Sequence, residues 1–176
     1  IVEVFTVTTT DGGDTQDITI TINGAADASL ISVTGSGESA IGGVTEETGV
    51  DGNNKISTSG TISVTDADTS DTAAFETDAS DIVFKAADST NGTALGAFTI
   101  DSVGAWGYSV ANDNAAVQAL DTGETIVEVF TVTTTDEGDT QDITITINGT
   151  NDGPSITVPG VQASTLSYTE GDGAVD

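Results

Sequence analysis

The strongest constraint on the fold of this chain is a long internal repeat. Residues 1–24, IVEVFTVTTTDGGDTQDITITING, return as residues 126–149 with 23 of 24 positions identical. The match weakens beyond this stretch, although Ile31 still stands opposite Ile156. Near-identity between neighbouring segments indicates a tandem array. We therefore predict the C-terminal hairpin of a preceding repeat at 1–24, a linker at 25–29, one complete repeat at 30–149, a linker at 150–154 and the start of a following repeat at 155–176.

Alternation of apolar and polar residues predicts strands throughout the complete repeat. Ile143, Ile145 and Ile147 alternate with threonine, which gives a strand one apolar and one polar face. Residues 111–124 are expected to form a short helical turn and a loop. The expected strands are 30–34 and 41–45, which form a broken first strand, then 56–65, 72–77, 81–86, 94–101, 104–113, 125–135 and 140–148.

Two of these strands should form an aromatic hairpin, in which Phe98 and Ile100 face Trp106, Tyr108 and Val110. No segment has a helical period of apolar residues, and turn-forming residues recur about every ten positions. Many short antiparallel strands with such spacing predict an all-β chain folded as a β-sandwich.

One strand contains a conflict of phase. In residues 125–135, Val127 and Val129 fall on the opposite face from Phe130 and Val132. An extra residue in one strand of a pair shifts every later side chain to the other face, so we expect a β-bulge here.

The charge balance excludes several classes of partner. Of 176 residues, 29 are acidic and two, Lys55 and Lys85, are basic, for a formal net charge of −27. Without cations to replace phosphate counterions, nucleic acid and anionic membrane surfaces are excluded as partners. No apolar run reaches the roughly 18 residues that span a membrane, and the first residues do not resemble a signal peptide. The acids could form a solvated, halophile-like surface, or they could meet in space and hold divalent cations.

The composition also argues against catalysis. The chain has no His and no Cys, so the usual general bases, nucleophiles and ligands of zinc, copper and haem are missing. A pair of carboxylates could hydrolyse a glycoside, but nothing distinguishes two of the 29 acids. Trp106 has no exposed aromatic neighbour in the sequence and is better explained as hairpin core than as a sugar platform. We expect that the protein is not an enzyme.

Residues 96–154 resemble the VCBS repeat of large bacterial surface and secreted proteins, which include the giant RTX-type adhesins exported by type I secretion. The aromatic hairpin, NAAVQAL, FTVTTTD and the final ITINGTNDGP carry the resemblance. It extends over roughly residues 57–154 and over the duplicate at 1–24, and LSYTEGDGAVD at 166–176 looks like the start of a related cadherin-like repeat. The resemblance implies an Ig/cadherin-like Greek-key β-sandwich in a tandem array, located outside the cell or on its surface, which acts as a calcium-stiffened extender in adhesion and biofilm formation.

In such a sandwich, alternate loops lie at the same end. We name the end at which residues 25–29 arrive the N-terminal end and the end at which the chain leaves the C-terminal end. The N-terminal end should collect Asp27, Asp66, Asp68, Asp136 and Asp139. The C-terminal end should collect Glu46, Glu47, Asp121, Glu124, Asn151 and Asp152.

These acids and amides suit calcium, which binds about six to eight oxygens supplied by irregular loops. In NGTNDGP, oxygen donors follow a strand directly: Asn148, Asn151 and Asp152. The pattern resembles the cadherin linker, where an Asn-Asp-rich segment, a DxD pair and upstream glutamates share calcium ions. The first linker, NGAADAS, has fewer such donors, so its site should be weaker. The presence of Asp136 and Asp139 is explained equally well by the tight turn between the last two strands, which favours Asp and Gly for backbone reasons alone.

The sequence thus predicts an extracellular calcium-binding structural repeat that spaces and stiffens a bacterial adhesin or surface fibre. Its partners would be the adjacent repeats of the same chain. One alternative is a subunit of a self-assembling filament or surface layer, because the edges of the hairpin at 1–24 could pair with other copies of the chain. Another alternative is a carbohydrate- or protein-binding module.

Overall fold

The computed structural model describes residues 1–68 and 70–153, and its regular structure within these ranges consists of β-strands without an α-helix. The predicted third repeat at 155–176 and Pro154 lie outside the described residues. The prediction of an all-β chain is confirmed. The strands are β1 (Val2–Thr8), β2 (Thr15–Thr21), β3 (Leu30–Ser32), β4 (Ile41–Thr45), β5 (Lys55–Thr61), β6 (Ser63–Thr65), β7 (Val83–Phe84), β8 (Ala97–Ile100), β9 (Ala105–Ala111), β10 (Thr125–Thr133) and β11 (Thr140–Asn148).

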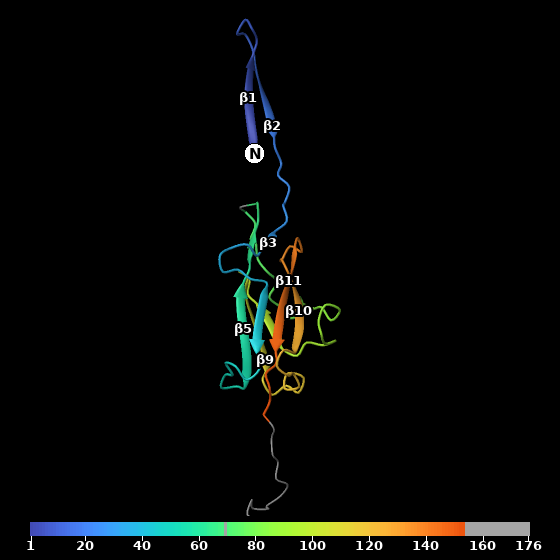
Figure 1. Cartoon of the computed structure of the whole chain (residues 1–176). Helices are drawn as coiled ribbons and strands as arrows, with labels where there is room; N and C mark the ends of the chain where they lie inside the picture. The colour runs from blue at the N-terminus through green and yellow to red at the C-terminus, as the bar shows by residue number, and fades with distance from the viewer. Residues whose placement is uncertain (69, 154–176) are drawn as a thin grey trace, which may run out of the picture.

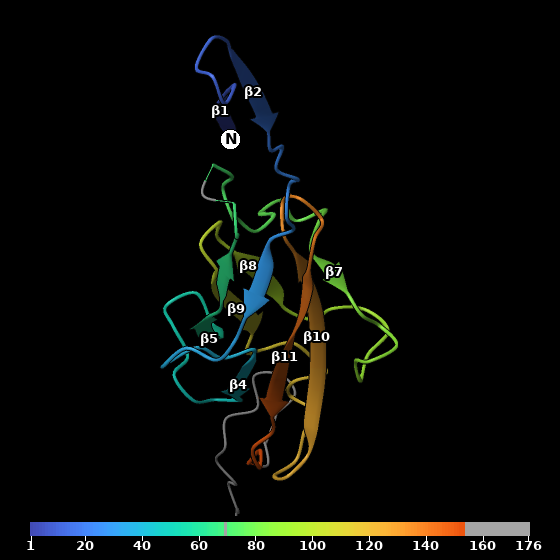
Figure 2. The same ribbon diagram turned by 90° about the horizontal axis from the view of Figure 1, so that it is seen from above.

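Two sheets face each other in the body formed by residues 30–149. One sheet has the order β4-β11-β10-β7 and the other the order β5-β9-β8, and β3 and β6 form a short additional pair. Figures 1 and 2 show these strands gathered in one body, with the β1–β2 hairpin outside it. The ring of Phe130 on β10 stacks on the ring of Phe98 on β8, with centroids 4.9 Å apart. The hydrophobic core therefore lies between the two sheets.

The first strand of the body is broken, as predicted. Its first half, β3, pairs antiparallel with β6, and its second half, β4, pairs parallel with β11. A turn closed by the Glu38 N–H and the Gly35 carbonyl lies between the halves. The parallel pairing differs from the antiparallel arrangement expected from short strands. After the turn, the chain continues in the other sheet as β4, where it lies beside β11 and runs in the same direction.

Three predicted elements are shorter than expected. The strand at 56–65 is interrupted at Ile62, whose N–H donates to the Gly104 carbonyl of a neighbouring turn. The strand at 72–77 reduces to a bridge between Phe75 and Thr134, and that at 81–86 reduces to β7. In these three strands, partners distant in the sequence decide how far the strand extends. Residues 111–124 form the expected short helical turn and loop, with one i→i−4 hydrogen bond, from Gln118 N to Asn114 O.

The expected β-bulge in β10 is wrong. Strands β10 and β11 pair without interruption from Thr125 opposite Asn148 to Thr133 opposite Thr140. The residue in phase with Phe130 and Val132 is Glu128, and it is buried in the core with them. The conflict of phase therefore has a different cause, a carboxylate at an apolar position, which is described below.

The aromatic hairpin is confirmed. Phe98 lies opposite Tyr108, and Ile100 lies opposite Trp106. The indole N–H of Trp106 donates to the Ser39 carbonyl at 2.9 Å. A Cβ at Gly60, on the neighbouring strand β5, would overlap the indole ring, so this ring requires the glycine beside it.

The β1–β2 hairpin repeats the pairing of β10 and β11 but lacks their surroundings. Its register, with Val2 opposite Thr21 and Thr8 opposite Thr15, is the same pairing displaced by the repeat offset. All residues of β1 and β2 are exposed. Ile145 is 0% exposed in the core, whereas its counterpart Ile20 is 46% exposed. Identical local sequence thus forms the same hairpin in two environments.

This pair of isoleucines gives a matched test of where the stability arises. We expect Ile145→Ala to lower the free energy of unfolding of the body by about 2–5 kcal/mol, because it leaves a cavity in the core. Ile20→Ala should change it by less than about 0.5 kcal/mol, because the side chain contacts no core. Denaturation followed by the fluorescence of Trp106, the single Trp of the chain, measures both values. An equal loss in both variants would contradict this description of the core.

Candidate functional site

The N-terminal end brings the first linker against the loop that contains Asp66 and Asp68. The Asp27 N–H donates to Asp68 Oδ2 at 2.8 Å, and the Ser29 hydroxyl donates to Asp66 Oδ2 at 3.0 Å. Asp66 Oδ1 also accepts the N–H of Asp68 at 2.8 Å. The predicted meeting of Asp27 with the DAD sequence is confirmed.

The β10–β11 turn holds the same linker from the other side. Asp136 Oδ2 accepts the Ser29 N–H at 2.7 Å, and Asp139 Oδ2 accepts the Ile31 N–H at 2.9 Å. The second oxygens of these carboxylates accept N–H groups of the turn itself, those of Gly138 and Thr140. The two acids thus bind backbone amides of the turn, of Ser29 in the linker and of Ile31 in β3. This agrees with the second explanation of these acids, a turn required by the backbone.

These hydrogen bonds change the acidity of Asp136. The Ser29 N–H, the Thr134 side chain and the Gly138 N–H stabilise its ionised form, and they hold the pKa of the Asp136 carboxyl well below its usual range. The Asp136 carboxyl is therefore a charged anchor for the linker throughout the neutral and mildly acidic range.

At the C-terminal end, the central residue is Glu46, which follows β4. Its side chain is 0% exposed. Glu46 Oε1 accepts a hydrogen bond from Gln118 Nε2 at 2.6 Å, and Oε2 accepts one from the Thr150 N–H at 3.2 Å. In the part of the chain that the structure describes, every ion pair involves Lys85. The Glu46 carboxylate is thus buried against neutral donors at the start of the second linker.

Asn148 and Glu124 fasten the end of β11 beside Glu46. The Asn148 side chain donates from Nδ2 to the Val44 carbonyl at 2.9 Å, and the Asn148 carbonyl accepts the Glu46 N–H at 2.9 Å. The Gly149 N–H donates to the Glu124 carbonyl at 3.1 Å. Predicted residues of three distant segments therefore do meet here.

The remaining predicted ligands at this end lie around that group. Asp121 donates its N–H to Glu124 Oε2 at 3.0 Å. Glu47 has a positive φ of 57° and donates its N–H to Asn112 Oδ1. Asn151 and Asp152 are exposed, and the Asn151 Nδ2 donates to the Asp152 carbonyl at 3.3 Å. These residues lie around the same end of the sandwich, and the hydrogen bonds among them are donated by backbone and amide groups.

The two ends differ in how well they fit a cation. No group of three or more acidic side chains among residues 1–68 and 70–153 is close enough to hold a metal ion. At both ends neutral donors bind carboxylates: those of Asp66, Asp136 and Asp139 at the N-terminal end, and that of Glu46 at the C-terminal end. At the C-terminal end, the buried hydroxyl of Thr150 has no hydrogen-bond partner within the described residues. An unpartnered oxygen beside a buried carboxylate fits a hard cation such as calcium.

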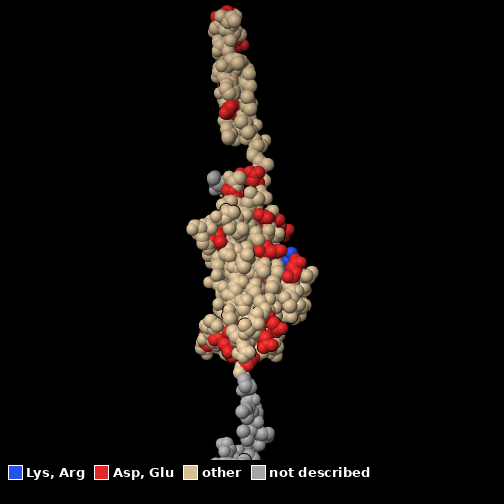
Figure 3. Space-filling view, in the orientation of Figure 1, with Lys and Arg blue, Asp and Glu red and all other residues tan. Residues whose placement is uncertain are grey.

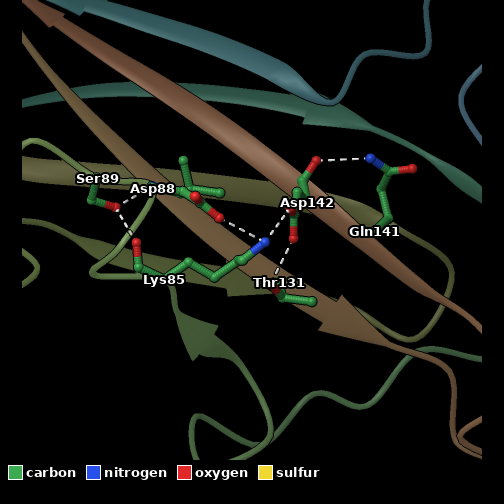
Figure 4. Close-up of polar contacts among 7 residues, drawn as sticks. Lys85, Asp88, Ser89, Thr131, Gln141 and Asp142 are labelled. Atoms are coloured by element: carbon green, nitrogen blue, oxygen red, sulfur yellow. Dashed lines mark hydrogen bonds and ion pairs between the residues drawn. The ribbon is translucent and has the colours of Figure 1, made fainter.

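Figure 3 shows acidic side chains gathered near both ends of the body, with a further group beside the single basic patch on this face. Sequence reasoning assigned no role to Lys85, which lies beside two acids. Its Nζ lies 2.8 Å from both Asp88 Oδ2 and Asp142 Oδ2 (Figure 4). The hydrogen bonds that the Lys85 ammonium donates to Asp142, and then to Asp88, raise the pKa of Lys85 above its usual value. Lys85 follows β7, so its ion pair with Asp142 reaches across β10 to β11.

Glu128 is the second functional group that the sequence did not reveal. It is 0% exposed, and its carboxylate accepts hydrogen bonds from the Tyr108 hydroxyl and from the N–H groups of Leu95 and Gly96. Burial and the neighbouring carboxylate raise the pKa of Tyr108. The signal in the sequence was the acid in phase with Phe130, but its partners lie 20 to 33 residues away and could not be identified from a local pattern.

No protein-family model matches the chain, and no curated protein matches it significantly. Within the described residues, no helix is long and apolar enough to cross a membrane.

The anchoring of the linker by Asp136 can be tested through its pH dependence. Because the pKa of this carboxyl is lowered in the folded protein, its contribution is present above the unfolded value of 3.8 and is lost as the pH falls through the lower folded value. The Ser29 amide resonance should therefore move in NMR spectra only when the pH falls below 3.8.

Asp136→Asn should abolish that titration and weaken the protection of the Ser29 amide at neutral pH. The matched control is Asp11→Asn, at the equivalent position of the β1–β2 hairpin, which should leave the Ser29 resonance unchanged. A titration of Ser29 that persists in Asp136→Asn would show that another group anchors the linker.

Proposed function

We propose that this chain is a calcium-binding structural repeat of an extracellular tandem array, in which Ig/cadherin-like sandwiches of the VCBS type space and stiffen a bacterial adhesin or surface fibre. The observation that carries the calcium proposal is Glu46, a carboxylate with 0% exposure and neutral donors at the point where the chain leaves the sandwich. A buried carboxylate is costly unless it is well bound, and a cation would neutralise it.

The strand order supports the Greek-key part of the proposal. Ig-type sandwiches place their first, second, fourth and fifth strands in one sheet and their third, sixth and seventh in the other. If β3 and β4 are two halves of the first strand and β5 and β6 two segments of the second, the sheets β5-β9-β8 with β3–β6, and β4-β11-β10-β7, match that division.

The tandem array is supported by the β1–β2 hairpin. Thr6 donates to Asp17 at 2.6 Å just as Thr131 donates to Asp142 at 2.6 Å. In the body, Asp142 also pairs with Lys85. Asp17 is therefore available to pair with a lysine of a preceding sandwich body, as Asp142 pairs with Lys85 in this one. The C-terminal hairpin of a preceding repeat would have this property.

Calcium at the C-terminal end would supply positive charge and bind oxygens of the body and of the second linker together. The chain's own contributions are the carboxylate of Glu46, the hydroxyl of Thr150 and the exposed oxygens of Asn151 and Asp152. Because these groups belong to both the sandwich and the linker, their joint binding would restrict the angle between adjacent repeats.

The test is thermal unfolding with and without calcium at matched ionic strength. Extracellular modules bind calcium with dissociation constants of about 10⁻⁴–10⁻³ M, and ligand at about 100 times that value adds about 2.7 kcal/mol. We expect a clear rise in Tm with calcium and little with equimolar magnesium, which prefers a tight octahedral shell and its own water.

Glu46→Gln should remove most of that rise, whereas Glu137→Gln, at the opposite end of the body, should retain it. Equal stabilisation by calcium, magnesium and sodium would show that the acids are merely screened, as on a halophile-like surface.

The exposed hairpin favours a second candidate function, a subunit that assembles with copies of itself. Phe5, Ile18 and Ile20 are each about half exposed on β1 and β2, and an isolated hairpin is marginal in water. Sedimentation across a range of concentrations distinguishes the two functions. Assembly that is lost when Phe5 and Ile18 are changed to Ser would support the subunit, and a monomer at all concentrations would exclude it.

A further inference from the structure

β8 lies at the edge of the sheet β5-β9-β8, and alternate residues of it point their backbone groups away from β9. The Asp101 N–H, just beyond the strand, donates to the Ala105 carbonyl at 2.9 Å. The residue of β8 in phase with this bond is Thr99, which therefore bonds to β9. The N–H and C=O groups of Phe98 and Ile100 point outward, and they have no hydrogen-bond partner among the described residues.

The open part of this edge is limited to the strand itself. Before β8, the Gly96 N–H donates to the carboxylate of Glu128. After β8, the Ser102 carbonyl accepts the Phe75 N–H at 3.1 Å. Backbone groups on both sides of the strand are thus bound within the body, and the unpaired stretch has the length of one short strand.

The edge of the other sheet on β10 is covered. β7 pairs with part of it, and the Lys85 N–H that follows donates to the Val129 carbonyl at 2.9 Å. The Val129 N–H donates to the Ser89 hydroxyl at 2.9 Å, and the Val127 N–H donates to the Thr90 hydroxyl at 2.9 Å. Side-chain hydroxyls therefore replace a further strand, and β7, with two residues, is too short to receive one.

The edges of β4 and β5 are also protected. The Ser39 hydroxyl accepts the Ile41 N–H at 3.1 Å and donates to the Ile41 carbonyl at 2.8 Å, which closes the start of β4. β4 in turn lies against β5, and a Cβ built on Gly42 would be 3.0 Å from the side chain of Thr58. Native proteins block sheet edges by such means against pairing with other chains.

The charge of the chain also distinguishes β8. Residues 89–100 contain no charged residue, although the chain has 29 acids. The side chains that β8 exposes, Ala97 and Thr99, are small and neutral, and their neighbours on β9 are Ser109 and Gly107. A second chain can therefore approach this edge without bringing carboxylates together.

We propose that β8 pairs with β8 of a second copy of the chain, antiparallel about a two-fold axis at Thr99, so that two sheets of three strands join into one. In this register Phe98 lies opposite Ile100 of the second copy, and all the free N–H and C=O groups of both residues are bound. On the outer face Thr99 lies opposite Thr99, and Ala97 lies opposite Asp101. Apolar side chains thus meet apolar ones, threonines meet, and no like charges are opposed.

Antiparallel pairing makes the two bodies point in opposite directions, because the strands run along the length of the body (Figure 1). If the chain is part of a surface fibre, the paired copies come from two facing surfaces. Each contact is small, and the repeats of an array add their contacts together. This consequence rests on the proposed function, whereas the pairing of β8 does not.

The experiment records the amide NMR signals of the full chain from dilute to concentrated solution, in salt that screens the net charge of −27. The amide signals of Phe98 and Ile100 should shift with concentration, and their hydrogen exchange with solvent should slow several-fold. Ser57, at the covered edge of the same sheet, should not change. Assembly through the β1–β2 hairpin would also leave Phe98 and Ile100 unchanged.

Signals of Phe98 and Ile100 that are the same at every concentration would overturn the proposal. Rapid exchange throughout would mean that the edge stays open, and protection throughout would mean that a segment of the same chain covers it. The measurement needs no calcium, so its failure leaves the calcium proposal untouched.

Three variants test the two-fold axis. Thr99→Asp places two carboxylates opposite each other and should abolish the concentration-dependent shifts, whereas Ser59→Asp adds the same charge to the same sheet face on β5 and should retain them. Thr99→Lys should also fail to pair alone, but an equimolar mixture of Thr99→Asp and Thr99→Lys chains should pair, because opposite charges then meet. Pairing that survives in Thr99→Asp alone, or a mixture that behaves like its separate components, would contradict the proposed register.

Discussion

The contact between the two sheets depends on the ring of Phe130. This ring stacks on Phe98 at 4.9 Å and lies within 6.0 Å of Tyr108, so it joins the β10–β11 pair to the aromatic hairpin. Phe98 in turn stacks on Trp106. Because aromatic rings carry large apolar areas, a few of them can supply much of a core in a chain that has one Trp and five Phe. The positions of both candidate ends follow from this contact, since it fixes the sheets whose loops form them.

The alternation of apolar and polar residues correctly predicted the strands that bury every second side chain in the core. The hairpin of Phe98 and Trp106 and the pair β10–β11 have such faces, and the structure contains them within two or three residues of the predicted limits. Residues 72–77 were also predicted to form a strand, but only Phe75 forms a bridge, to Thr134. Strand length depends on the neighbour in the sheet, and a single sequence does not show that neighbour.

The candidate site was predictable to a similar extent. Loop alternation in a sandwich placed Asp68 with Asp27 and Glu46 with the second linker, and hydrogen bonds at both ends agree with that placement. What the sequence could not show is which oxygens are already bound to backbone amides, as in Asp136. For Glu128 the prediction failed in a different way. The sequence places Glu128 on the same strand face as Phe130, but its burial in the core is explained only by hydrogen-bond donors from elsewhere in the chain, such as Tyr108.

The parallel pairing of β4 with β11 also determines how the body responds to tension. The chain enters through β3 and β4 and leaves through β11, and five residue pairs join β4 to β11, from Ile41 opposite Thr144 to Thr45 opposite Asn148. A force that pulls the two ends of the body apart draws these two strands in opposite directions along their length. The hydrogen bonds between them lie across that direction and are loaded together in shear, whereas bonds at a hairpin opening would break one after another. The topology therefore gives the sandwich a mechanical clamp between the points where load would enter and leave it.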